Sequence, residues 1–216
     1  PLAASAVSAV FKAYDVRGRV PDELDEPLAE AIGRAFALLV RREEPDTTRV
    51  VVGTDMRPSG IALGAAFTAG VTSEGLDVVD LGLASTDMLY FASGHLGIPG
   101  AVLTASHNPA AYNGMKLCLS AARPVGSDTG LGAMAAGIIA GFGDADPLGG
   151  GSATSVDMLP AFVDHVRSFV DLDALRPMRV VVDTANGMGG LVVPAVFDGL
   201  PFHLDHLYPE LDGTFP

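Results

Sequence analysis

The segment RVVVG at residues 49–53 is a short apolar run of β-branched side chains, which is typical of a strand buried on both faces. Residues 59–74 then return to helical spacing. Residues 76–81 indicate a second strand, residues 86–96 a helix and residues 98–104 a further buried strand. Because strands and helices alternate, the sequence predicts an α/β fold: a layered, mixed and mostly parallel sheet flanked by helices.

Two segments on either side extend this pattern. Residues 25–42 carry apolar side chains at helical spacing, with acidic residues early and basic residues late, as the helix dipole favours. We expect an amphipathic helix there. Asn113-Gly114 is a strong signal for a tight turn, so we expect residues 115–119 to turn back as an antiparallel strand.

The Gly-rich stretch at residues 141–155 has a composition that neither packs nor holds a regular element, which indicates a domain boundary. We interpret residues 1–148 as the first domain and residues 149–216 as an incomplete second domain of the same type. The part beyond the Gly-rich stretch, about 60 residues, is short for an independent α/β domain. Its expected elements are a helix near residues 156–170, a strand at 178–183, a helix near 188–197 and a strand near 202–207.

Composition excludes several classes of protein. Of the 216 residues 49% are hydrophobic, which suffices for a packed core, and 13 Lys and Arg against 26 Asp and Glu give a net charge of −13. This charge opposes binding to nucleic acid or to an anionic membrane, so we expect neither partner. Residues 130–143, the longest stretch without a polar side chain, are too few for a bilayer that needs about 20. We expect a cytoplasmic protein in which the single cysteine, Cys118, is a buried and inert thiol.

The segment TASHNPAAYNGMK at residues 104–116 is the most informative for chemistry. It follows a predicted buried strand, and ligands of α/β sheets bind beyond the carboxyl ends of strands, so Ser106 is a candidate nucleophile or phosphoryl carrier. His107 is the next residue. Because adjacent side chains on an extended loop usually diverge, we do not expect a Ser-His hydrolytic pair. On local chemistry alone, the alternative is an ordinary polar loop.

TASHNP at residues 104–109, followed by YNGMK at 112–116, resembles the phosphoserine loop of the α-D-phosphohexomutase superfamily, in its phosphomannomutase/phosphoglucomutase branch. Three further segments are similar to motifs of this family in order and spacing: FKAYDVRG at residues 11–18, GTDMR at 53–57 and VDTANG at 182–187. The motifs extend over essentially the whole chain. The resemblance therefore implies the N-terminal half of such an enzyme.

The resemblance implies a reversible phosphoryl transfer that interconverts hexose 1-phosphate and hexose 6-phosphate. Phosphorylated Ser106 would donate to the hexose phosphate substrate, and the bound bisphosphate would reorient and return its other phosphoryl group. The catalytic residues would be Ser106, His107 and Lys116, of which Lys116 is the better candidate for proton transfer or for holding the transferring group. The implied cofactors are Mg²⁺ and a hexose 1,6-bisphosphate as activator.

Five more residues match family positions around the phosphoserine. Tyr14, Arg17 and Asn108 would bind substrate or phosphate, and the planar fork of an arginine suits a phosphate. We expect Asn108 mainly to fix the loop. Asp55 and Arg57 would be supporting residues, an ion pair that braces the phosphoserine loop.

The sequence departs from the family in one respect. Such enzymes bind Mg²⁺ with an Asp-Gly-Asp-x-Asp-Arg loop, which this chain lacks. The metal ligand of this chain would be Ser106, through its phosphate, and the remaining ligands would lie beyond residue 216. We expect the fragment to be inactive alone, and to form a homodimer or pair with the missing C-terminal half, because truncation exposes a sheet edge and an apolar patch.

Two alternatives stay open at this point. Within the same class, the nearest rival is phosphoglucosamine mutase, although Tyr112 before Asn113-Gly114 favours the phosphomannomutase branch. From a different class, the fragment could be a non-catalytic binding or interaction module that retains the loop without the chemistry. A phosphate on Ser106, detected by mass spectrometry, would favour the enzyme.

Overall fold

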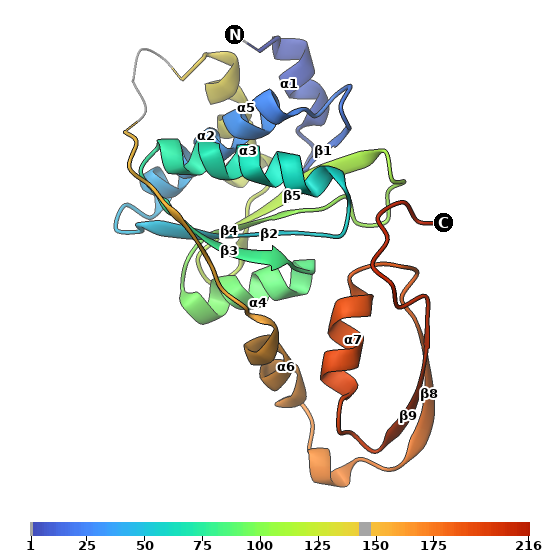
Figure 1. Cartoon of the computed structure of the whole chain (residues 1–216). Helices are drawn as coiled ribbons and strands as arrows, with labels where there is room; N and C mark the ends of the chain where they lie inside the picture. The colour runs from blue at the N-terminus through green and yellow to red at the C-terminus, as the bar shows by residue number, and fades with distance from the viewer. Residues whose placement is uncertain (1, 143–147) are drawn as a thin grey trace.

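The computed structural model describes residues 2–142 and 148–216, and Figure 1 shows a central sheet between two layers of helices, with a smaller unit beside it. The alternation of strands and helices expected from the sequence is confirmed. The elements are α1 (Ala4–Val10), β1 (Val16–Arg19), α2 (Glu26–Glu43), β2 (Arg49–Thr54), α3 (Ser59–Ser73), β3 (Asp77–Leu83), α4 (Thr86–Leu96), β4 (Gly100–Leu103), β5 (Tyr112–Leu119), β6 (Arg123–Pro124), α5 (Leu131–Ile139), β7 (Ala153–Ser155), α6 (Leu159–Arg167), β8 (Met178–Asp183), α7 (Gly189–Phe197) and β9 (Phe202–Leu207), with 3-10 turns at Ser127–Thr129 and Leu172–Ala174.

The main sheet has the strand order β1-β5-β4-β2-β3-β7, and β6 pairs with β5. Strands β4, β2, β3 and β7 are parallel, whereas β5 is antiparallel to both of its neighbours, β4 and β1. Among the described strands of this sheet, β5 alone runs against the others, so the predicted mixed, mostly parallel sheet is confirmed. The central strand β2 is covered on both faces, because Val50, Val51 and Val52 are each no more than 2% exposed.

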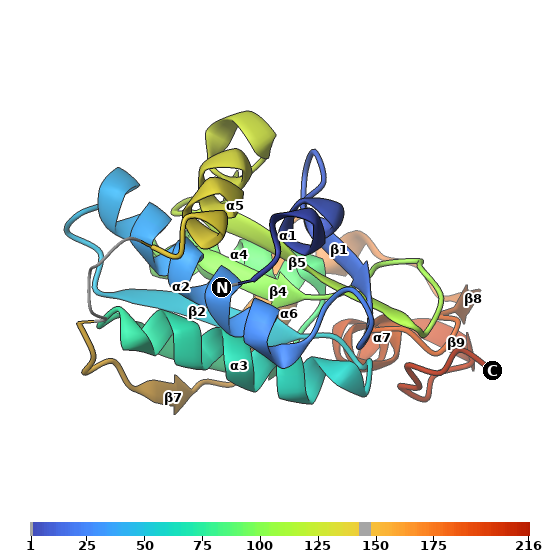
Figure 2. The ribbon, with the colours of Figure 1, turned by 90° about the horizontal axis from the view of Figure 1, so that it is seen from above.

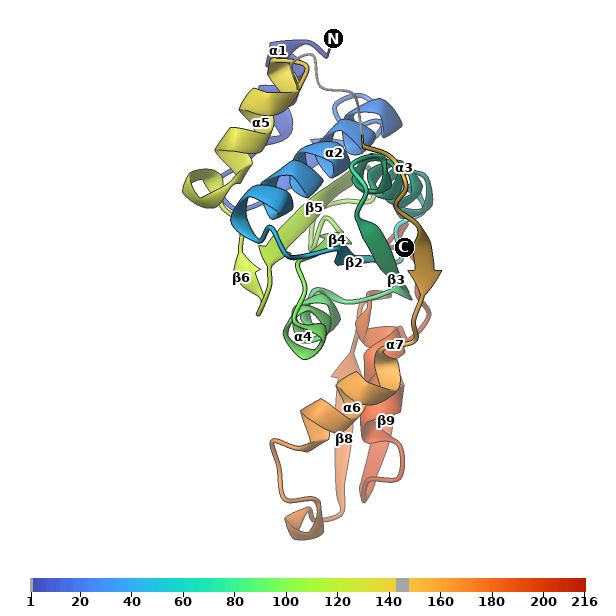
Figure 3. The ribbon, with the colours of Figure 1, turned by 90° about the vertical axis from the view of Figure 1, so that its left-hand side faces the viewer.

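Helices cover both faces of the sheet, as Figures 2 and 3 show. Helices α1, α2, α3 and α5 share one apolar core with the sheet, and α4 shares a second core with α6 on the opposite face. The predicted amphipathic helix is α2. Asp25 caps it by accepting a hydrogen bond from the Leu28 backbone nitrogen at 3.0 Å. Among the helices that the structure describes, none combines the length and the hydropathy that a bilayer crossing requires.

Helices α1 and α5 have no counterpart among the elements expected from the sequence. Their segments, ASAVSAV and LGAMAAGII, consist mostly of small or apolar residues and contain no charged side chain. They therefore lack the charged face by which an amphipathic helix is recognised. Val7 and Val10 of α1 and Leu131 and Met134 of α5 are buried in the first core, so tertiary packing stabilises both helices.

The Asn113-Gly114 pair is not a turn, which corrects the sequence-based expectation. Both residues lie inside β5 and pair with β1, while the chain reverses earlier, in the loop between β4 and β5. A Cβ atom on Gly114 would lie 2.1 Å from the Val16 carbonyl oxygen, so this glycine permits the close approach of β1. The antiparallel direction expected for residues 115–119 is confirmed.

The stretch at residues 141–155, of which 143–147 lie outside the described residues, contains a strand that the sequence did not indicate. Strand β7 extends the main sheet by pairing in parallel with β3. Helix α6 follows, and its Phe162 is buried in the core that α4 shares with the sheet. The core around α4 thus includes residues that follow β7, and we call residues 2–142 and 148–177 the first unit.

Strands β8 and β9 form a separate two-stranded parallel sheet, connected by α7. Both strands lie where the sequence predicts them. The ring centroids of Phe197 on α7 and Phe202 on β9 are 5.6 Å apart, so the helix packs on this sheet. We call residues 178–216 the second unit.

Burial also confirms the expectation for the single cysteine. Cys118 lies on β5 with no exposed surface and belongs to the core that contains α4. Its burial raises the pKa of the Cys118 thiol. The thiol is therefore protonated at neutral pH and packs as a small apolar group.

Helices α2 and α3 cross with their backbones in contact. A Cβ atom at Gly33 would lie 2.1 Å from the Phe67 carbonyl oxygen, and one at Gly70 would lie 2.0 Å from the Glu30 carbonyl oxygen. Backbone atoms cannot rotate away as a flexible side chain can. A methyl group at either position would therefore force the two helices apart.

We expect Gly33→Ala to lower the free energy of unfolding by about 3 kcal/mol, the upper end of the usual cost of overpacking. Gly94→Ala is the matched control, because Gly94 lies in α4 with nothing within 4 Å of its hypothetical Cβ atom. Alanine is the better helix former, so this control is expected to gain up to about 1 kcal/mol. Urea unfolding followed by circular dichroism measures both values, and equal stability of the two variants would contradict the close helix contact.

Candidate active site

The loop between β4 and β5 presents Ser106 to solvent. Ser106 has a φ of 51°, in the left-handed region, and its backbone nitrogen donates to Thr104 Oγ1 at 3.0 Å. The Asn108 nitrogen donates to the Ala105 carbonyl oxygen at 3.0 Å. The buried strand β4 therefore ends in a tight turn with an unfavourable backbone conformation at the exposed serine.

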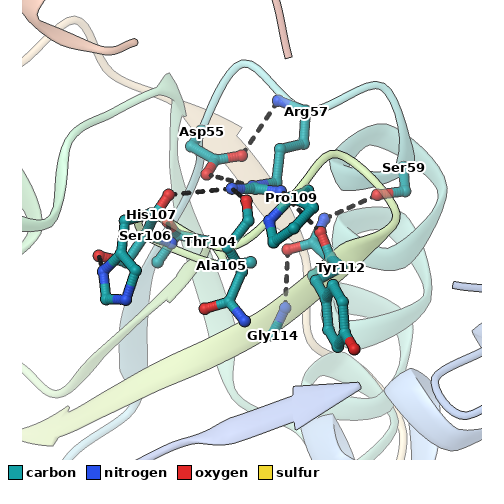
Figure 4. Close-up of polar contacts among 12 residues, drawn as sticks. Asp55, Arg57, Ser59, Thr104, Ala105, Ser106, His107, Pro109, Tyr112 and Gly114 are labelled. Carbon is teal, nitrogen blue, oxygen red and sulfur yellow. Dashed lines mark hydrogen bonds and ion pairs between the residues drawn. The ribbon is translucent and has the colours of Figure 1, made fainter. Parts of the chain in front are cut away.

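Arg57 holds this loop from within the protein, as Figure 4 shows. Its Nη1 donates to the carbonyl oxygens of Pro109 and Tyr112, both at 2.9 Å. Its Nη2 donates to the carbonyl oxygens of Ser106, at 2.9 Å, and Asn108, at 2.7 Å. A single guanidinium group thus binds four backbone carbonyls spread along the loop, from the serine to the first residue of β5.

Asp55 neutralises the charge of Arg57. Its Oδ2 accepts a hydrogen bond from Arg57 Nε at 3.2 Å, and its Oδ1 accepts one from the Arg57 backbone nitrogen at 3.0 Å. Every N–H group of the guanidinium is then engaged. The Arg57 side chain is 0% exposed, and this desolvation lowers the pKa of Arg57 while Asp55 raises it. The two side chains form a buried ion pair behind the loop.

A second group of charged side chains surrounds Arg17. Its Nη1 donates to Asn108 Oδ1 at 2.9 Å and to the Ala105 carbonyl oxygen, and its Nη2 donates to Asp15 Oδ2 at 2.6 Å. Lys116 Nζ lies 3.5 Å from the same carboxylate oxygen. The cavity beside these groups measures about 310 Å³ and is lined by Lys12, Asp15, Arg17, Ser106, His107, Asn108 and Lys116.

The charges that line this cavity favour an anion. Lys12, Arg17 and Lys116 are cations and Asp15 is the only carboxylate among the lining residues, so the formal charge is +2 with His107 neutral. The chain as a whole has a net charge of −13. Positive charge is therefore concentrated beside the Ser106 hydroxyl, where a phosphate would be attracted.

Asp15 has a structural role that sequence analysis did not assign. Its carboxylate accepts hydrogen bonds from both Arg17 and Lys116 and so holds the two cations near each other. The two-residue spacing between this aspartate and this arginine could have predicted their ion pair, because residues two apart on an extended chain project to the same side. Asp15 and Arg17 have this spacing within FKAYDVRG.

Ser106 and His107 approach more closely than their adjacency suggested. The distance between Ser106 Oγ and His107 Nδ1 is 3.4 Å, and both side chains are exposed. The left-handed backbone at Ser106 explains the approach, because successive side chains alternate sides only on an extended chain. The contact is at the long limit for a hydrogen bond.

The structure does not bring Tyr14 into this group. Its side chain is 81% exposed and is absent from the described lining of the cavity. Arg17 lies inside the group, and its Nε is buried without a hydrogen-bond partner among the described residues. Tyr14 and Arg17 therefore differ in their environment although they belong to one sequence motif.

A larger cleft of about 620 Å³ lies on the side of Ser106 that faces the second unit. It is lined from the first unit by the Ser106 loop, by Asp55 and Met56, and by the start of α4. From the second unit Thr184, Ala185, Gly187, Met188 and Phe215 contribute. Ser106, His107 and Asn108 border both cavities, so the loop separates the cationic cavity from this cleft.

The described residues do not form a magnesium site. Among them no group of three or more His, Cys, Asp or Glu side chains is arranged to hold a metal ion. Near Ser106, Asp55 is bound to Arg57 and Asp15 is bound to Arg17 and Lys116. Mg²⁺ prefers several oxygen ligands in octahedral geometry, which these paired carboxylates do not offer.

We expect Arg57→Met to lower the free energy of unfolding by about 3 to 5 kcal/mol, because it leaves the buried Asp55 carboxylate and four loop carbonyls without their donor. Arg42→Met is the matched control. Arg42 pairs with Glu43 on the surface, with side chains 58% and 40% exposed, so we expect a change within about 0.5 kcal/mol. Guanidinium chloride unfolding measures the free energy of unfolding of both variants. A similar small loss of stability in both would refute the proposed bracing role of Arg57.

Comparison with known proteins gives an independent test of these observations. Residues 8–135 match the family model described as phosphoglucomutase/phosphomannomutase, alpha/beta/alpha domain I. A relative from Xanthomonas campestris pv. campestris named "Phosphohexose mutases" is 43% identical over 211 residues, which cover 95% of this chain and 45% of the relative. A relative from Salmonella montevideo named "Phosphomannomutase" is 39% identical over 215 residues, covering 95% of this chain and 46% of the relative.

The fold agrees with the same family. The crystal structure of a phosphoglucomutase/phosphomannomutase family protein from Burkholderia thailandensis matches with a TM-score of 0.87 and 32% identity, covering 100% of this chain and 46% of that one. The chain therefore spans about half the length of the relatives that it matches. The family model covers more than half of the chain and includes β1, Asp55, Arg57 and the Ser106 loop, so the chain belongs to the phosphoglucomutase/phosphomannomutase family.

Proposed function

We propose that this chain carries the phosphoserine loop of a phosphohexomutase, an isomerase that interconverts hexose 1-phosphate and hexose 6-phosphate. One observation carries the proposal: an exposed serine, on a loop braced by a buried arginine, borders a cavity with a formal charge of +2. Phosphoryl transfer requires positioning and neutralisation of negative charge more than covalent work by side chains. This arrangement supplies both.

In the proposed reaction, Ser106 carries a phosphoryl group on Oγ. The bond from phosphorus to Oγ breaks as a hydroxyl oxygen of the hexose phosphate forms a new bond to phosphorus, and the hydroxyl proton passes to a base. Ser106 Oγ leaves phosphorus with the electron pair of the broken bond and takes up one proton, so the products are a hexose bisphosphate and free Ser106. After the bisphosphate has turned in the site, the reverse step returns its other phosphoryl group to Ser106, and the hexose leaves as the isomer.

The residues of this chain would divide the work as follows. Lys116, tied to Asp15 at 3.5 Å, is the candidate for holding the transferring group or moving the hydroxyl proton. Arg17 donates to Asn108 and Ala105 and so positions the loop, and it lines the cationic cavity in which a phosphate would bind. His107, at 3.4 Å from Ser106 Oγ, is the second candidate for the proton.

Two parts of the proposal, the magnesium ion and the choice of sugar, depend on groups that are not among the described residues. A phosphate on Ser106 would provide one ligand to Mg²⁺, which would neutralise developing charge, and the other ligands would come from beyond residue 216. Mannose phosphate is favoured as the substrate by the name of the Salmonella relative. Glucose phosphate and glucosamine phosphate are the competing substrates, and a hexose 1,6-bisphosphate is the proposed activator.

We expect Ser106→Ala to reduce hexose phosphate isomerisation by the full-length protein by orders of magnitude without loss of stability. The side chain is exposed, so its removal leaves no cavity. Ser127→Ala, at an exposed serine in the turn before α5, is the control and is expected to keep wild-type turnover. Intact mass spectrometry after incubation with hexose 1,6-bisphosphate should find one phosphate on the wild type and the control and none on Ser106→Ala. Wild-type turnover by Ser106→Ala would refute the assignment.

We expect Lys116→Met in the full-length protein to lower kcat by about two to four decades with a smaller change in KM, because the ammonium group acts on charge that develops in the transition state. Folding should survive, since Met115, Leu117 and Cys118 supply the buried contacts of β5. Steady-state assays with saturating Mg²⁺ and bisphosphate activator measure the effect. Wild-type kcat would exclude Lys116 and leave Arg17 as the principal cation.

A non-catalytic binding module is the alternative from a different class. It predicts hexose phosphate binding without isomerisation and no phosphate on Ser106 in the wild type. Isothermal titration with glucose 6-phosphate, compared with the assays above, separates the two functions.

A further inference from the structure

The last residues of the chain cover Arg57. The Cζ atom of Arg57 lies 4.9 Å from the centroid of the Phe215 ring, within the range of a cation–π interaction. Gly213 lies against the backbone beside it: a Cβ atom there would be 2.5 Å from Arg57 Cα and 2.7 Å from the Met56 carbonyl oxygen. The residue that braces the Ser106 loop is therefore itself in contact with the second unit. Figure 1 shows the C-terminal end of the chain running from α7, β8 and β9 toward the main sheet.

The turn that presents Phe215 is anchored to the loop after β8. The Asp212 nitrogen donates to the Asn186 carbonyl oxygen at 3.0 Å, and Asn186 Nδ2 donates to the Glu210 carbonyl oxygen at 3.1 Å. Asp212 Oδ1 accepts from both the nitrogen and the hydroxyl of Thr214, which lowers the pKa of Asp212. The Phe215 nitrogen donates to the Asp212 carbonyl oxygen at 3.1 Å. The backbone that carries the Phe215 ring is therefore anchored to the second unit.

We propose that Phe215 is a positioning residue, which couples the placement of the second unit to the conformation of the Ser106 loop through Arg57. The contacts form a continuous path from Asn186 through Asp212 and Phe215 to the guanidinium group, and from there to the four loop carbonyls. Phe215 also lines the cleft between the units, so a ligand in that cleft would contact the same ring.

The proposed coupling works because the Phe215 ring keeps water away from the buried guanidinium group of Arg57. The Arg57 side chain is 0% exposed with the ring in place, and each of its guanidinium N–H groups binds a protein oxygen. Removal of the ring lets water compete for those donors and removes the attraction of the ring for the charge. The loop, which has a positive φ at Ser106, then opens more often.

For turnover, this inference rests on the proposed function, because only a phosphoryl carrier needs an accurately placed Ser106. The coupling itself is a property of the fold. It is measured without any enzymatic assay, through the exchange of the hydrogen-bonded amides of Ser106, Asn108 and Tyr112.

The first experiment compares hydrogen–deuterium exchange of residues 105–112 in this chain and three variants. Phe215→Ala and Phe215→Leu remove the aromatic ring, and Phe215→Tyr retains it. We expect exchange of the loop amides to rise about tenfold in the Ala and Leu variants and to stay within about twofold of wild type in the Tyr variant. Leucine keeps most of the apolar volume of phenylalanine. A rise in amide exchange in the Leu variant is therefore caused by loss of the aromatic ring and not by loss of volume.

Phe142→Ala is the matched control. The Phe142 ring lies 4.5 Å from Cζ of Arg34, so the variant removes a second arginine–aromatic contact outside the described lining of both Ser106 cavities. It should leave exchange of residues 105–112 unchanged. Unchanged exchange in Phe215→Ala, or an equal rise in Phe142→Ala, would overturn the proposed coupling.

The second experiment measures isomerisation by the same variants of the full-length protein. We expect kcat to fall about tenfold in Phe215→Ala and Phe215→Leu with KM within about twofold, and to be restored in Phe215→Tyr. Altered loop exchange with no isomerase activity even in wild type would refute the proposed function and leave the coupling intact. A change confined to KM would refute the positioning role and indicate direct contact of Phe215 with substrate.

Discussion

The geometry around Ser106 depends on one buried guanidinium group. Arg57 binds four backbone carbonyls of the loop, with Asp55 as its counter-ion. A loop that leaves a sheet has carbonyl oxygens that no neighbouring strand satisfies, and those buried beneath it must find donors. An arginine supplies five donors in one rigid plane, so it can satisfy several carbonyls at once and fix their relative positions.

This brace explains how the serine can be both exposed and ordered. Ser106 has a φ of 51°, a backbone conformation that is unfavourable for any residue other than glycine. Such a conformation is kept only where the surrounding structure imposes it. The carbonyl oxygens of Ser106 and Asn108, on either side of His107, are held by the same nitrogen of Arg57. The conformation that orients the serine is therefore maintained by interactions beneath the loop, which leaves the hydroxyl face open to a ligand.

The sequence was informative wherever a local pattern has a single physical explanation. Alternating apolar runs and helical spacing predicted α2, β2, α3, β3, α4 and β4, but not β1, β6 or the two uncharged helices. The motifs singled out Ser106, Arg17, Lys116 and the Asp55–Arg57 pair as candidate site residues. Asn113-Gly114 misled, because its turn signal is local, whereas the close approach of β1 is a property of the sheet. The same limit concealed β7, which is a strand only because β3 offers it an edge.

By itself, the sequence determined the α/β class, the order of its main elements and the loop that carries the serine, because these follow from hydrophobic periodicity and from contiguous motifs. Only the tertiary structure decided which charges meet. Arg57 lies 49 residues from Ser106, Lys116 lies 101 residues from Asp15, and Phe215 reaches Arg57 from the far end of the chain. Such contacts depend on strand order and on the packing of the two units, and no local pattern encodes the distance between segments that only the fold brings together.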